Sequence, residues 1–92
     1  MGVIEEQKIR FGNNIRAVRI NQRMNQSEVA EKADLALHTV CRAESGIVNM
    51  DSMLRICDAL GVSVGDMFGE PITPLYSDKF IGKWRQKRID GR

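Results

Sequence analysis

Long apolar runs are missing from this sequence of 92 residues, and so is a large excess of either charge. Because no apolar run exceeds three residues, no segment is expected to span a bilayer. Residues 1–6 lack a basic patch followed by an apolar stretch, so we expect no secretory signal there. With 2 prolines and no low-complexity run, the composition excludes collagen-like, mucin-like and linker-type chains.

Cysteine and histidine are also scarce. The two cysteines, Cys41 and Cys57, lack the paired spacing of a metal or redox motif, and the single histidine is His38. We therefore expect reduced thiols in a cytoplasmic protein, with no metal and no cofactor. The carboxylates are scattered and no Ser/His/Asp or Cys/His set has a supporting motif, so the sequence does not predict an enzyme.

The charge is small in sum and uneven in distribution. The net charge is +2, and 28% of residues are charged against 42% hydrophobic, which is ordinary composition for one small globular domain. Residues 1–6 carry −2, residues 7–68 carry +1 and residues 69–92 carry +3. A chain that only coats phosphate would be more basic. If nucleic acid is the partner, a few well-placed cations must bind it, and dimerisation would double them.

Apolar residues recur at helical spacing along most of the chain, and no strand pattern or internal repeat is visible. Phe11, Ile15 and Val18, for example, fall at positions i, i+4 and i+7. The sequence therefore predicts a compact all-α domain over residues 7–69. Its five expected helices cover 7–23, 26–33, 36–45, the segment between Asn49 and Gly61, and 64–68. Cys57 and four methionines are expected in the core: Met24, Met50, Met53 and Met67.

Capping residues support these helix boundaries. Asn25 followed by Glu28 has the pattern of a capping box, in which side chain and backbone satisfy each other's hydrogen bonds. Asn49 is expected to cap the fourth helix, and Gly46 is a stop signal after the third.

The segment from Gln26 to Ser45 is the most informative. Two short helices joined by a tight turn must approach closely, and the small side chain of Ala30 stands where they would cross. Leu35 is an apolar anchor in the turn, and Val40 would fill the space beneath the second helix. Such a unit projects that helix outward as a rod about as wide as the major groove of DNA.

On these residues the chain resembles the Cro and lambda-repressor-like helix-turn-helix DNA-binding domains of phage and bacterial regulators. The resemblance covers about residues 8–68 and rests on four segments: FGNNIR (11–16), MNQSEVA (24–30), TVCRAESG (39–46) and ALGVS (59–63). It implies a transcriptional regulator, expected to be a repressor, that binds specific sequences of double-stranded DNA. The expected form is a homodimer that places the 36–45 helix in the major groove.

The resemblance also implies which residues bind DNA. The family's phosphate-clamping Gln corresponds to Gln26, assisted by Asn25. Of the positions that read bases, Arg42 is the strongest candidate because a guanidinium can donate two parallel hydrogen bonds to guanine. The full set of these base-reading positions is Ala36, Leu37, His38 and Arg42. Arg16 is a further candidate for DNA contact. Cys41 lies on the same helix, where its oxidation would block binding.

Arg19 and Glu44 match the positions of a buried ion pair in the family. The arginine late in the first helix and the glutamate that ends the third hold those two helices together. The resemblance therefore implies a structural role for this pair and no catalytic one.

Three features depart from the family pattern. Asp34 stands in the turn where Gly is usual, and Ala43 stands where a larger aliphatic residue is common. The loop over residues 45–49 is short and has no cation, whereas this loop in the family is often basic and reaches the DNA backbone. We therefore expect a shallow salt dependence of DNA binding from residues 7–69.

Residues 70–92 differ in character from the domain. Pro71 and Pro74 predict an extended connection, and a basic amphipathic stretch, a candidate sixth helix, follows from Ser77. Docking of this tail on a second subunit ranks first, DNA contact second and membrane binding last, since so short a segment would bind membrane only slightly. The candidate dimer contacts of the chain are Val64, Met67, Phe68, Phe80 and Trp84.

The sequence is also compatible with two other functions. In the first, the same fold is an antitoxin whose tail binds and neutralises a toxin protein. In the second, the domain has lost DNA contact and binds only proteins. A regulator of this length would act by occupancy, either by covering a promoter or by touching RNA polymerase beside it.

Overall fold

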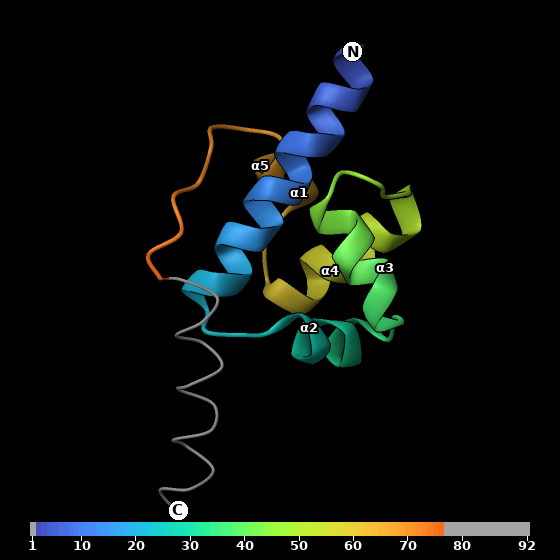
Figure 1. The fold of residues 1–92 in the computed structure, drawn as a ribbon, viewed down its shortest axis with the longest axis vertical. Coiled ribbons are helices and arrows are strands. Elements are labelled where there is room, and N and C mark those ends of the chain that lie inside the picture. The colour runs from blue at the N-terminus through green and yellow to red at the C-terminus, as the bar shows by residue number, and fades with distance from the viewer. Residues whose placement is uncertain (1, 77–92) are drawn as a thin grey trace, which may run out of the picture.

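The computed structural model describes residues 2–76, and the candidate sixth helix with Phe80 and Trp84 lies outside them. The described part contains five helices and no strand (Figure 1). The prediction of an all-α, five-helix domain is therefore confirmed for this part. The helices are α1 (Val3–Asn21), α2 (Gln26–Ala33), α3 (Leu37–Glu44), α4 (Met50–Leu60) and α5 (Val64–Met67).

Several helix boundaries differ from the prediction by one to four residues. Helix α1 begins at Val3, four residues before the predicted start, with Glu5 and Glu6 in its first turn, where carboxylates interact favourably with the helix dipole. It ends at Asn21 because Arg23 adopts a left-handed backbone conformation with φ of 60°. Ala36 is extended and lies just before α3 rather than inside it.

The predicted caps are present. The side chain of Asn25 accepts a hydrogen bond from the Glu28 amide at 2.8 Å, and the Asn25 amide donates to the Glu28 carboxylate at 2.9 Å. Asn49 accepts from the Ser52 amide at the start of α4. Asp34 ends α2 in a left-handed conformation with φ of 57°, which an Asp tolerates better than most residues do.

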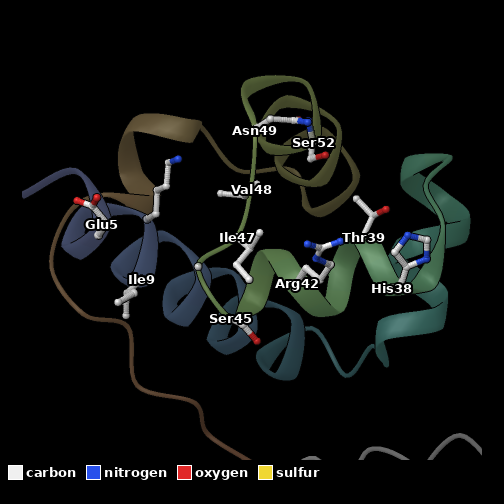
Figure 2. A pocket seen from close by; sticks show the side chains of 12 residues that line it. Glu5, Ile9, His38, Thr39, Arg42, Ser45, Ile47, Val48, Asn49 and Ser52 are labelled. Atoms are coloured by element: carbon white, nitrogen blue, oxygen red, sulfur yellow. The ribbon is translucent and has the colours of Figure 1, made fainter. Parts of the chain in front are cut away.

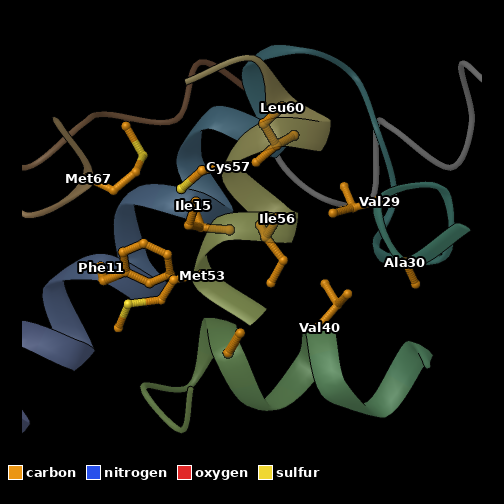
Figure 3. Packing of buried hydrophobic residues seen from close by; sticks show 11 residues of the cluster. Phe11, Ile15, Val29, Ala30, Val40, Met53, Ile56, Cys57, Leu60 and Met67 are labelled. Atoms are coloured by element: carbon orange, nitrogen blue, oxygen red, sulfur yellow. The ribbon is translucent and has the colours of Figure 1, made fainter. Parts of the chain in front are cut away.

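The core lies between α1, α2, α3 and α4 (Figure 3). Its central side chains are fully buried: Phe11, Ile15, Val29, Val40 and Ile56. Cys57, Met53 and Met67 join them as expected, whereas Met50 was expected in the core and is 63% exposed. Met50 is the first residue of α4, and its side chain points away from the stripe that this helix buries.

Gly12 permits the closest approach between α1 and α3. A Cβ atom at this position would lie 2.5 Å from the carbonyl oxygen of Ala43 and 2.7 Å from that of Glu44. These acceptors belong to backbone, which cannot move aside as a flexible side chain can. The absence of a side chain therefore sets the distance between α1 and the C-terminal end of α3.

Residues 70–76 run along α1, and we call them the strap (Figure 1). The Asn14 side chain donates to the carbonyl oxygens of Met67 and Glu70 and accepts from the Ile72 amide. Asn21, two helical turns further on, donates to the carbonyl of Thr73 and accepts from the amide of Leu75. The strap is extended, as the prolines predict, but it is tied to the domain.

Candidate nucleic-acid interface

The outer face of α3 carries the side chains that the sequence assigns to base reading. Leu37 is 47% exposed, and His38 and Arg42 are exposed as well, whereas Val40 and Ala43 on the opposite face are buried. This division follows from the helical period, since residues three or four positions apart share a face: Arg42 lies four positions after His38, and Ala43 lies three after Val40. Ala36 is also exposed and stands at the N-terminal end of the same face.

A groove of about 720 Å³ lies beside this face. Figure 2 shows His38, Thr39 and Arg42 along α3 on one side of it, and Glu5 and Ile9 on α1 at the other. The loop between α3 and α4 lies between them, with Asn49 and Ser52 at the start of α4. The groove is open to solvent along the exposed side of α3.

Gln26 opens α2 next to α3, and its side-chain amide is already oriented by two contacts. Its Nε2 donates to Glu44 Oε1 at 3.0 Å, and its Oε1 accepts from the Cys41 thiol at 3.0 Å. An amide nitrogen carries two protons, and the bond to Glu44 uses one of them. The sequence did not reveal that half-buried Cys41 positions Gln26, because this contact joins two helices fifteen residues apart.

Arg19 and Glu44 are brought together by the fold. Arg19 Nε lies 2.6 Å from Glu44 Oε2 and Nη2 lies 3.1 Å from Oε1, with both side chains almost fully buried. Arg19 Nη1 also donates to the carbonyl of Met24 at 2.9 Å. Arg19, Glu44, Gln26 and Cys41 therefore form one continuous hydrogen-bonded chain from α1 through α3 to the first residue of α2.

The remaining predicted DNA contacts are placed less centrally. Asn25 caps α2, and its side chain is used by the capping box. Arg16 is exposed on α1 and has an interaction within the chain. The loop over residues 45–49 has no cation, but it lines the groove with Ile47, which is 59% exposed.

The predicted dimer contacts at α5 lie largely inside the subunit. Met67 is 2% exposed and belongs to the core, so its predicted role on an exposed dimer surface is not supported by its placement. Val64 and Phe68 are half-buried against the same core, with the Phe68 ring 5.3 Å from that of Phe11. Phe80 and Trp84, together with the tail on which the antitoxin alternative depends, lie outside the described residues.

Residues 2–76 contain no group of three or more His, Cys, Asp or Glu side chains that could hold a metal ion. None of the helices in this part combines the length and the apolarity needed to cross a membrane.

A capped helix joined by a tight turn to a second short helix with an exposed outer face is the arrangement of a helix-turn-helix DNA-binding domain. The model of the family described as Cro/C1-type HTH DNA-binding domain matches residues 14–69. The chain therefore belongs to this family, and it is a DNA-binding regulator of the helix-turn-helix class. A search of curated proteins found no match.

Proposed function

We propose that this protein is a transcriptional repressor that binds specific double-stranded DNA sequences as a homodimer, in the cytoplasm. The observation that carries the proposal is the outer face of α3, where Leu37, His38 and Arg42 are exposed side by side. Helix α3 enters the major groove, and occupancy of a promoter blocks transcription.

Arg42 supplies the main base contact. It is exposed, and it lies one turn beyond His38 on the same face. A bidentate contact with guanine O6 and N7 discriminates against other bases by about 1–3 kcal/mol. His38 contacts a neighbouring base edge, and Leu37 and Ala36 make apolar contacts such as those that a thymine methyl group accepts.

The N-terminus of α2 supplies the phosphate contact. In a helix, the amides of the first turn have no acceptor within the helix. In α2 the capping box satisfies that of Glu28, and the amides of Gln26 and Ser27 belong to the same first turn. Together with the helix dipole and the second amide proton of Gln26, these groups suit a phosphate oxygen.

The length of α3 supports the homodimer. Its 8 residues give a helix about 12 Å long, which spans only three or four base pairs. Two copies that read half-sites about 34 Å apart, one duplex turn, would double the number of specified base pairs.

A selection of bound duplexes from a random pool tests the proposal. It should return a two-fold symmetric sequence, and failure to enrich any sequence at low salt would refute the proposal. Arg42→Ala should relax the preference at one base pair per half-site, whereas Gln26→Ala should weaken binding to all sequences about equally. Arg55→Ala is the matched control, because Arg55 is an exposed arginine of α4 that pairs with Asp51 at 3.0 Å and lies 4.0 Å from Asp34, and it is neither a predicted base-reading residue nor part of the first turn of α2.

A further inference from the structure

The exposed face of α3 has two flanks, and different parts of the chain border them. Successive residues of a helix turn by about 100°, so Cys41 and Thr39, two positions apart, point to opposite sides of α3. Cys41 bonds Gln26 at the start of α2, whereas Thr39 lines the groove described above (Figure 2). The N-terminus of α2 and this groove therefore lie on opposite flanks of the face that carries His38 and Arg42.

Lys8 of α1 lines the far wall of this groove, and its side chain is half-buried there. The next residue, Ile9, lies against Gly46, two residues after the end of α3, since a Cβ atom at Gly46 would be 3.0 Å from the Ile9 side chain. Lys8 therefore stands beside the C-terminal end of α3, across the groove from Arg42.

The bases around the groove have no partner of their own within residues 2–76. None of the side chains of Lys8, His38 and Arg42 makes a hydrogen bond or an ion pair in this part of the chain. Glu5 is the only carboxylate among the described residues that line the groove, so Lys8 and Arg42 leave it with a net positive charge. A positive hollow that is open to solvent attracts an anion from outside the chain.

The phosphate backbones of DNA stand on both sides of a helix that enters the major groove. The major groove is about 12 Å wide, and a helix with its side chains is about 10–12 Å in diameter. With α3 between them, one backbone lies toward Gln26 and the other toward Lys8. The loop over residues 45–49 borders this second flank and has no cation, so Lys8 provides a charge that the loop lacks.

We propose that Lys8 binds a DNA phosphate on the flank of α3 opposite to Gln26, so that each flank of α3 holds one of the two backbones. This inference rests on the proposed function, and it extends that function to a residue before position 14, where the match to the family model begins. A lysine suits the role, because its ammonium is a point charge on a flexible stem and needs no fixed geometry. Such a contact positions α3 in the major groove and reads no base.

Salt dependence of binding tests the inference in the full chain. Lys8→Gln should reduce the slope of log K against log salt by about 0.9, the contribution of one phosphate contact, and should weaken binding to all sequences about equally. Lys8→Arg keeps the charge and should retain most of the slope. The matched control is Lys32→Gln, which removes the same charge from an exposed position of α2 outside the groove and should leave the slope nearly unchanged.

Glu5 gives a test of opposite sign. Glu5→Gln removes the carboxylate that opposes the phosphate, so it should strengthen binding at low salt. Glu6→Gln removes the same charge from the next residue, which is also exposed in the first turn of α1 but does not line the groove, and it should have a smaller effect. If Lys8→Gln and Glu5→Gln both weaken binding in step with a lower midpoint of urea unfolding, this end of α1 acts through stability alone, which would overturn the inference.

The outcomes separate this inference from the proposed function. If the unaltered protein binds no duplex at any salt concentration, both fail. If it binds a specific duplex and Lys8→Gln reduces the slope no more than Lys32→Gln does, the inference is overturned while the proposed function stands. If Lys8→Gln instead lowers the fraction of dimer in sedimentation equilibrium with the slope unchanged, Lys8 serves the dimer, which also overturns the inference.

Discussion

The ion pair between Arg19 and Glu44 gives the sharpest prediction for stability. Arg19→Ala removes two bonds to Glu44 and one to the Met24 carbonyl, and it leaves the buried Glu44 carboxylate with only Gln26 among these partners. A buried charge that loses its partner costs about 3–5 kcal/mol. Domains have a total stability of about 5–15 kcal/mol, so a loss of this size would remove a large share of the free energy of unfolding.

Thermal unfolding, followed by the helical signal in circular dichroism, measures this loss. Since about 1 kcal/mol shifts Tm by about 4–8 °C in a domain of this size, Arg19→Ala should melt at least about 12 °C lower. Arg10→Ala is the control, because Arg10 is exposed and makes one long bond of 3.4 Å to Gly69. It should change stability by no more than about 0.5 kcal/mol. Equal losses in the two variants would refute the role of the pair.

A second variant separates burial from pairing. Replacement of both members, Arg19→Met with Glu44→Leu, leaves no stranded charge and should recover part of the stability that Arg19→Ala loses. If the double variant is less stable than the single one by several kcal/mol, the cost lies in lost packing and the reasoning about the stranded carboxylate is wrong.

Three further predictions concern single positions. Gly12→Ala should cost about 1–3 kcal/mol of unfolding free energy, because its Cβ would meet backbone oxygens at 2.5 and 2.7 Å. Gly65→Ala is the control and should be tolerated, because its Cβ would have nothing within 4 Å. Similar midpoints of urea unfolding for the two variants would contradict the steric role of Gly12. Asp34→Gly should raise the unfolding free energy by up to about 1 kcal/mol by relieving the left-handed conformation at φ of 57°, and a loss of stability would show that the Asp side chain matters more. Burial raises the pKa of Cys57 to about 11, so its reactive thiolate is scarce below that pH. A thiol reagent at pH 8 should therefore label Cys41 in the folded protein and both cysteines in urea. Rapid labelling of Cys57 in the folded protein would refute its burial.

The helices could be predicted because their signals are local. Asn25, Glu28 and Asn49 cap helices through bonds to residues three positions away, and such bonds can be inferred from spacing alone. The start of α1 could not, because residues 3–6 are exposed and an exposed turn shows no apolar period. Met50 shows the same effect, since hydrophobicity alone does not define which face of a helix is buried.

The candidate site was predictable in its composition and less so in its contacts. Arg42 and His38 could be placed on the exposed face of α3 because helical geometry fixes their phase. The hydrogen bond from Cys41 to Gln26 and the bonds from Asn14 and Asn21 to the strap depend on how helices cross in three dimensions. Spacing in the sequence contains no signal for them.

The strap also has a consequence for the order of folding. Its bonds to Asn14 and Asn21 join residues 52–58 positions apart, so they close a loop that contains almost the whole domain, at a cost in chain entropy that grows with loop length. During synthesis, α1 through α4 can collapse before the partners of these asparagines have been translated. The outer side of the first helix therefore acquires its cover last, and exchange of the Ile72 and Leu75 amides with deuterium should precede that of the core helices.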